Sequence, residues 1–86
     1  MIRLDKLLKA VANKRRLAIL TYLKTAREAP VGDIADRIKL SLKATSKHLA
    51  VLDAVDIVEK EQRSKHIFYR LASGQHTVVR HIISVI

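Results

Sequence analysis

The segment from Leu40 to Leu52 contains the residues of this chain best suited to chemistry with an anion. Three of its positions, Thr45, Leu49 and Leu52, recur at helical spacing and predict one buried face. The opposite face carries short or cationic side chains, namely Lys43, Ala44, Ser46, Lys47 and Ala50. Small side chains let a helix backbone come close to a polyanion, and lysines can meet its phosphates or base edges. The pattern predicts an amphipathic helix that docks on nucleic acid.

The charge of the whole chain supports this interpretation. The formal net charge is +9, from 17 basic and 8 acidic residues, and no acid occurs between Asp36 and Asp53. An ordinary surface helix would mix glutamates with its lysines. An excess of this size indicates an anionic partner, most often nucleic acid and sometimes a membrane surface.

The composition also excludes several classes of function. The 86 residues contain no cysteine, which excludes disulfides, thiolate catalysis, thiol redox sensing and thiolate metal sites. No nucleophile has a neighbouring base, and no glycine-rich phosphate loop occurs, so we do not expect an enzyme. No apolar run approaches the length of a membrane span, and no signal peptide is evident. We expect one soluble, cytoplasmic domain over residues 1–86.

The periodicity of the apolar residues predicts which elements position these side chains. Only two glycines and one proline punctuate the chain, which indicates a mostly helical fold. The predicted helices span 2–12, 14–25, 33–39, 42–55 and 75–86. Asn13 and Ser41 are the predicted N-caps, and Ala29-Pro30 is predicted to break the chain. Two strands, 57–62 and 66–71, are predicted around a basic turn at 63–65. The fold class is therefore mainly α with a small β-hairpin, in the order α-α-α-α-β-β-α.

This order is that of a winged helix-turn-helix, and four segments resemble the ArsR-type repressors of bacteria and archaea. The segment 7–20 (LLKAVANKRRLAIL) resembles their opening "lfkaLadptRlrIL", and 31–35 (VGDIA) resembles "vseLa". The segment 46–52 (SKHLAVL) resembles "SrHLkvL", and Ile57-Val58 with 68–71 (FYRL) resembles "glV…YyrL". Lys39 and Asp56 depart from the family, which usually has glycine at these turns.

The resemblance implies a homodimeric regulator that binds double-stranded DNA, usually as a repressor; the sequence leaves activation open. The helix at 42–55 would enter the major groove, and the hairpin would reach toward the minor groove. The terminal helices, 2–12 and 75–86, would form the dimer interface. Its expected residues are Leu4, Leu8, Val11, Val79, Ile82, Ile83 and Ile86.

Lys43 and Lys47, one helical turn apart, are the main predicted DNA contacts, with two solvated lysines as the alternative. The predicted contacts on this helix are Lys43, Ala44, Ser46, Lys47 and His48, of which Ala44 could meet a thymine methyl group. The predicted contacts on the hairpin turn are Arg63, Ser64 and Lys65. Leu42 either touches a thymine methyl group or packs against the preceding turn, and the sequence leaves both open.

Two further pairs of residues have alternative interpretations. Arg15 and Arg16 could contact phosphate or pair with Asp5 or Glu28, and the resemblance implies a structural role for Arg16. His76 and His81 are five residues apart, so one ion cannot easily use both within a chain. We expect no metal and no cofactor, and the sequence leaves open a weak two-histidine site between subunits.

Three rival functions are compatible with parts of this pattern. A winged-helix protein-interaction module would use the same face for protein. A nucleoid-type binder would hold DNA with little sequence choice. A membrane-surface protein would use the last helix as an amphipathic anchor, although Arg80 is its one fixed positive charge.

Overall fold

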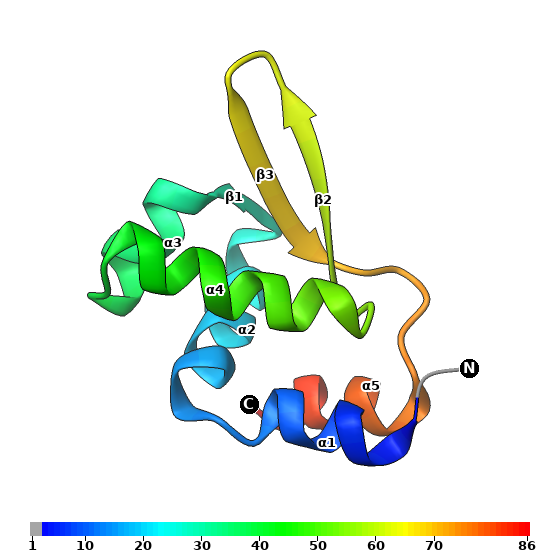
Figure 1. The fold of residues 1–86 in the computed structure, drawn as a ribbon. Helices are drawn as coiled ribbons and strands as arrows, with labels where there is room; N and C mark the ends of the chain where they lie inside the picture. The colour runs from blue at the N-terminus through cyan, green and yellow to red at the C-terminus, as the bar shows by residue number, and fades with distance from the viewer. Residues whose placement is uncertain (1–2) are drawn as a thin grey trace.

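The computed structural model describes residues 3–86 as five helices and three strands (Figure 1). The elements are α1 (Leu4–Val11), α2 (Lys14–Ala26), β1 (Glu28–Pro30), α3 (Val31–Ile38), α4 (Leu42–Ala54), β2 (Val58–Arg63), β3 (His66–Leu71) and α5 (Thr77–Val85). The predicted winged helix-turn-helix class, mainly α with a hairpin, is confirmed. Ile2, where the first helix was predicted to begin, lies outside the described residues.

Two side-chain caps, both predicted, fix the starts of α2 and α4. The Asn13 Oδ1 accepts from the backbone N–H groups of Arg15 and Arg16, at 2.9 and 3.0 Å. The Ser41 Oγ accepts from the N–H of Ala44 at 3.1 Å. Each cap satisfies donors that the first turn of a helix leaves without partners. The start of α4 is therefore fixed by local hydrogen bonding.

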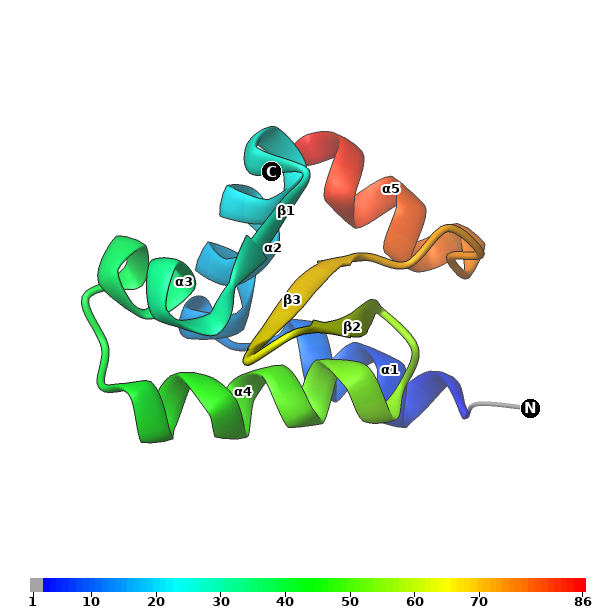
Figure 2. The same ribbon diagram turned by 90° about the horizontal axis from the view of Figure 1, so that it is seen from above.

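The predicted hairpin is part of a three-stranded antiparallel sheet in the order β1-β3-β2 (Figure 2). β1 pairs with β3 through Glu28↔Arg70, Ala29↔Tyr69 and Pro30↔Phe68. Ala29-Pro30 therefore does more than break the chain, because it forms the sheet's third strand. Proline is tolerated there because an edge strand has one side without ladder bonds. α3 follows directly and starts at Val31, two residues earlier than predicted.

The hydrophobic core is centred on α2 and completed by side chains from the other elements. Its largest fully buried aliphatic residues are Ile19, Leu20, Leu23, Ile34, Leu49, Leu52, Ile57, Val58 and Val79. Within α2, Ile19 is fully buried and Leu17 is half-buried. Tyr69 is buried and Phe68 is half-buried, so both aromatic rings of β3 pack within the domain.

The turns after α3 and after α4 use a left-handed backbone without glycine. Lys39, at the end of α3, has φ 56° and ψ 50°, and Asp56, after α4, has φ 58°. These are the two positions where glycine was expected from the resemblance. The turns therefore keep the geometry that glycine would allow. Each non-glycine residue in this conformation lowers the free energy of unfolding by about 1 kcal/mol.

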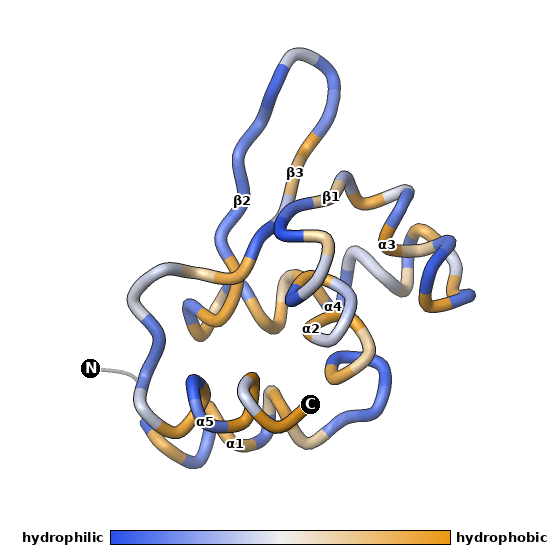
Figure 3. The backbone as a smooth tube through the Cα atoms, turned by 180° about the vertical axis from the view of Figure 1, so that it is seen from behind, coloured by the Kyte–Doolittle hydropathy of each residue, from blue (hydrophilic) through white to orange (hydrophobic). Residues whose placement is uncertain are grey.

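The hairpin of β2 and β3, which we call the wing, lies at the opposite end of the molecule from the terminal helices α1 and α5 (Figure 1). The hydrophilic wing tip is at one end, and α1 and α5 occupy the other (Figure 3). Within residues 3–86, no helix is both long enough and apolar enough to span a bilayer.

Candidate nucleic-acid interface

The outer face of α4 carries two exposed lysines among small side chains on one helix. Lys43, Ser46, Lys47 and Ala50 are all exposed. Thr45, Leu49 and Leu52 on the inner face are fully buried. Neither lysine takes part in an ion pair within residues 3–86. α4 runs along one edge of the molecule, so this face is open to a large ligand (Figure 2).

The structure places Ala44 and His48 on the flank of α4 instead of its outer face. Both residues are half-buried, whereas Lys43 and Lys47 are exposed. The two lysines and Ser46 are therefore brought together on one surface, and Ala44 and His48 are turned toward the body of the domain.

His48 takes part in a contact that ties α4 to the helices before it. The Arg16 Nη1 lies 3.2 Å from the His48 Nδ1. The same guanidinium donates to the backbone carbonyls of Lys9 and Ala10 at the end of α1. Arg16 therefore bridges α1, α2 and α4. This agrees with the structural role implied for it and does not support pairing with Asp5 or Glu28.

The charge state of His48 follows from this environment. Burial lowers the pKa of the His48 imidazole, and the nearby positive charges of Arg16 and Arg15 lower it further. The neutral ring can accept a hydrogen bond from Arg16 through Nδ1. His48 therefore helps to hold α4 in position and adds no positive charge to the surface. Arg15 donates to the carbonyl of Ile38 at 3.3 Å, so it too serves the packing of the domain.

The wing carries an ion-pair network that changes the interpretation of Arg63. This residue was predicted to lie at the free turn, but it is the last residue of β2. Its guanidinium pairs with Glu28 of β1 and with Glu61, and it lies 4.6 Å from the centroid of the Phe68 ring. The hydrogen bonds from Arg63 lower the pKa of both glutamates. Ser64 and Lys65 form the two-residue turn at the tip, where Ser64 has φ 58°.

Acidic residues at the end of α4 and on β2 pair with nearby cations. Glu59 and Glu61 pair with Arg70 at 2.9 and 3.0 Å, and Asp53 lies 4.0 Å from Lys60. The hydrogen bonds that the Arg70 guanidinium donates to both glutamates raise the pKa of Arg70. These carboxylates are held in place along the wing by arginines.

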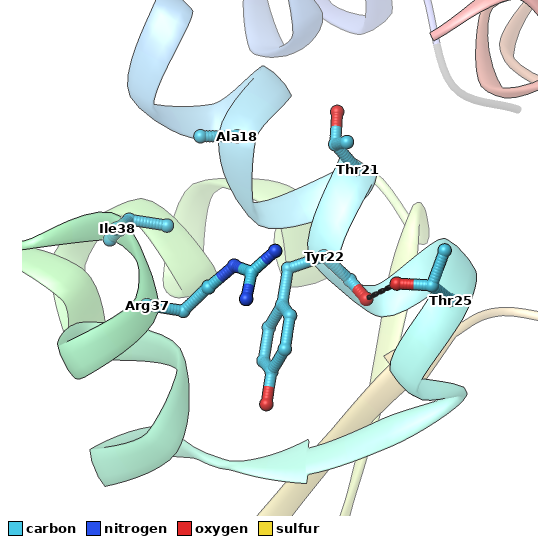
Figure 4. A pocket seen from close by; sticks show the side chains of 6 residues that line it. All are labelled: Ala18, Thr21, Tyr22, Thr25, Arg37 and Ile38. Atoms are coloured by element: carbon cyan, nitrogen blue, oxygen red, sulfur yellow. Dashed lines mark hydrogen bonds between the residues drawn. The ribbon is translucent and has the colours of Figure 1, made fainter.

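A hollow of about 360 Å³ lies between α2 and α3 (Figure 4). The Arg37 guanidinium lies over the Tyr22 ring at 5.6 Å from its centroid. The Thr25 hydroxyl is turned to the Tyr22 carbonyl, to which it donates at 3.1 Å. The lining residues are Ala18, Thr21, Tyr22, Thr25, Arg37 and Ile38. Sequence reasoning missed this hollow, because no spacing rule links residues 15 positions apart on two helices.

The terminal helices hold only part of the predicted dimer surface. Leu4 and Leu8 of α1 are 49% and 43% exposed. Ile82, Ile83 and Ile86 are half-buried against the core. Val11 and Val79, which were also predicted there, are buried inside the single chain. Val85, which was not predicted, is 68% exposed.

His76 has a local role at the start of α5. Its Nδ1 accepts from the N–H of Val78 at 3.1 Å, so the imidazole caps the helix. The helix consequently begins at Thr77, two residues after the predicted start at residue 75.

Comparisons with known proteins agree with this geometry. Residues 11–61 match the family described as a helix-turn-helix domain. The transcriptional activator HlyU of Vibrio cholerae is 42% identical over 69 residues, which are 80% of this chain and 63% of that protein. The homodimeric winged helix-turn-helix DNA-binding domain of Mb0332 from Mycobacterium bovis, a possible ArsR-family regulator, has a similar structure. It matches with a TM-score of 0.80 and 30% identity, covering 94% of this chain and 71% of that one. The chain belongs to the ArsR-type winged helix-turn-helix transcription regulators.

Two further structures place this ArsR-type chain among its relatives. Reduced HlyU from Vibrio cholerae matches with a TM-score of 0.81 and 40% identity, covering 94% of this chain and 81% of that one. NolR from Sinorhizobium fredii matches with a TM-score of 0.81 and 33% identity, covering 94% and 77%. The curated relatives are longer, since the matched segments are 63% of HlyU and 53% of the nodulation protein NolR of Rhizobium meliloti. The family and fold are those of DNA-binding regulators.

Proposed function

We propose that this ArsR-type regulator binds a defined double-stranded DNA sequence as a homodimer in the cytoplasm and represses transcription from it. α4 enters the major groove with Lys43, Ser46 and Lys47, and the wing tip places Lys65 against the backbone or minor groove. The role is binding and includes no catalytic step. The observation that carries the proposal is the outer face of α4, which is cationic and made of compact side chains.

The inner face of the same helix explains why this surface can hold a register on DNA. Thr45, Leu49 and Leu52 have no exposed surface, so α4 cannot rotate without breaking the core. Arg16 and His48 add a polar tie on its flank. The side chains that face the groove therefore project from a fixed helix, as sequence-dependent contact requires.

The distribution of charge favours DNA over a protein partner. Five of the acidic residues, Asp5, Glu28, Asp53, Glu59 and Glu61, lie within 4 Å of a lysine or arginine. The lysines of α4 have no such partner in the described part of the chain. The net charge of +9 therefore includes lysines of α4 that can release counterions from a duplex.

The exposed aliphatic residues of the terminal helices support the dimeric part of the proposal. Leu4 and Leu8 of α1 and Val85 of α5 lie at the end of the domain away from the wing. Pairing two such ends by a twofold axis buries these side chains and leaves both α4 helices free. Each half-site is then read by one subunit, about 34 Å from the other.

The test is binding-site selection from a random duplex pool, followed by titration of the selected site with variants. Replacement of both lysines (Lys43→Ala with Lys47→Ala) should weaken binding more than 30-fold, because four charges leave the dimer surface. The slope of log K against log salt is negative, and it should become less negative by about 4 if all four lysines of the dimer contact phosphate.

A matched control removes the same charge elsewhere. Lys6 and Lys14 are exposed and lie outside α4, so their joint replacement by alanine should change affinity by less than about threefold. If the α4 variant binds as tightly as the unaltered protein, or if selection enriches no sequence, the assigned face or the sequence-specific function is wrong.

A further inference from the structure

Leu42 is an exposed aliphatic side chain at the start of α4. It is the first residue of the helix, directly after the capping Ser41, and 55% of its surface is exposed. Leu40 packs against the hydrophobic core from the position before the cap. Because Leu40 already supplies the apolar contact of this turn, Leu42 is not needed to fix it.

The neighbours of Leu42 belong to the proposed DNA surface. Ser46 lies one turn further along the helix and Lys43 follows Leu42 directly, and both are exposed. The first turn of a helix in a major groove reaches the base edges, which places Leu42 among bases. The start of α4 lies away from α5 (Figure 1). A dimer formed through the terminal helices therefore leaves Leu42 uncovered.

We infer that Leu42 reads the 5-methyl group of a pyrimidine in the major groove. This inference rests on the proposed function and names the base chemistry that α4 selects. The C5-methyl group of thymine is the one apolar group that an unmodified base pair shows in this groove. Any other base edge would lose water at its donors or acceptors and gain nothing from an aliphatic side chain.

The contact with the thymine methyl group was first considered for Ala44, and the geometry favours Leu42 instead. Ala44 is half-buried on the flank of α4, whereas Leu42 is exposed and longer. The methyl group of each half-site therefore lies opposite Leu42, and the adjacent Lys43 is placed for a neighbouring guanine edge or phosphate.

The experiment removes the methyl group and changes nothing else in the base pair. Sites are selected from a random duplex pool with the unaltered protein and with Leu42→Ala, and the position whose thymine preference disappears is identified. Deoxyuridine then replaces thymine at that position. The unaltered protein should bind about fourfold more weakly per half-site, and Leu42→Ala should not distinguish the two duplexes.

Two controls separate this effect from general loss of binding. Val51→Ala shortens another exposed aliphatic side chain of α4, 40% exposed, and should leave the thymine preference intact. A second pair of duplexes compares cytosine with 5-methylcytosine at the same position. Tighter binding of the 5-methylcytosine duplex supports reading of the methyl group, and equal binding of the two duplexes contradicts it.

The two failures are distinguishable. If the unaltered protein binds its selected site but holds thymine and deoxyuridine equally well, the reading by Leu42 is overturned and the proposed function stands. If the unaltered protein enriches no duplex at all, the proposed function fails, and the inference fails with it.

Discussion

Arg16 shows how a single side chain can position a binding surface that it does not touch. Its guanidinium donates to two carbonyls at the end of α1 and faces the Nδ1 of His48 on α4. The contact requires a neutral imidazole, because a protonated ring has no acceptor to offer. The position of α4 on the body of the domain is thus linked to one protonation state.

A pH dependence follows from the lowered pKa of His48. A pKa that is lower in the folded state than in the unfolded state gives stability that is present above about pH 6.5 and is lost as pH falls below it. We expect the free energy of unfolding to decrease between pH 7.5 and pH 5.5. Urea unfolding at several pH values measures this decrease.

The histidine responsible is identified by substitution. His48→Gln keeps an acceptor for Arg16 and removes the titration, so the decrease should become shallower. His81→Gln alters an exposed histidine of α5 and should leave it unchanged. Equal slopes for His48→Gln and the unaltered protein would assign the pH dependence to other groups.

At the scale of elements, the turn between α3 and α4 keeps its form through a strained residue. Lys39 closes α3 in the left-handed region, with its N–H directed at the carbonyls of Ala35 and Asp36. Glycine adopts this backbone without a steric penalty. The angle between the two helices therefore depends on the backbone of residue 39 and not on its side chain.

Lys39→Gly should therefore raise the free energy of unfolding by about 0.5–1 kcal/mol. The melting temperature should rise by about 2–8 °C for a domain of this size. Lys47→Gly is the matched control inside α4, where the same change should lower stability by about 1 kcal/mol. A Lys39→Gly protein that melts below the unaltered one would show that the strain is absent.

How far the sequence predicts each element depends on how local its cause is. Asn13 and Ser41 were predictable as caps because a cap depends on residues within three positions. β1 was not, because Glu28–Pro30 is a strand only through pairing with β3, about 40 residues away. The buried face of α4 followed from periodicity, since Thr45, Leu49 and Leu52 repeat at helical spacing.

The wing illustrates the same limit for a functional residue. The prediction placed Arg63 in the turn, and the true register extends β2 by one residue to include it. That small difference moves the guanidinium from the tip to the sheet, where Glu28 of β1 can pair with it. The partner comes from the strand that the sequence did not reveal, so the ion pair could not be foreseen.

At the scale of the whole molecule, one copy is too small for a two-part DNA site. The domain measures 33 × 24 × 21 Å along its principal axes. Successive major grooves on one side of a duplex are about 34 Å apart. A single copy offers one α4, so contact with two grooves needs a second copy of the chain.

The proposed dimer can be tested at a residue that the single chain does not need. Leu8 is 43% exposed and lies outside the intrachain core, so Leu8→Asp should leave the fold intact. Placing a carboxylate in an apolar contact between subunits should shift sedimentation to the monomer and weaken binding to the selected site at least tenfold.

The control for this variant puts a carboxylate on another side of the same helix. Lys6 is exposed and lies on nearly the opposite side of α1 from Leu8, about 160° around the helix. Lys6→Asp should remain dimeric. If Leu8→Asp also sediments as a dimer, the subunits associate through a different surface.

The composition of the sheet's two outer strands limits how this chain can self-associate. β1 is three residues long and ends in Pro30, which has no N–H to donate. The other free margin belongs to β2, where Glu59, Lys60 and Glu61 follow one another. Neither edge strand offers a flat, apolar template for adding strands from further molecules. The sheet therefore resists the stacking of strands that leads to amyloid. Open-ended growth of strands between crowded copies of the protein is thereby disfavoured.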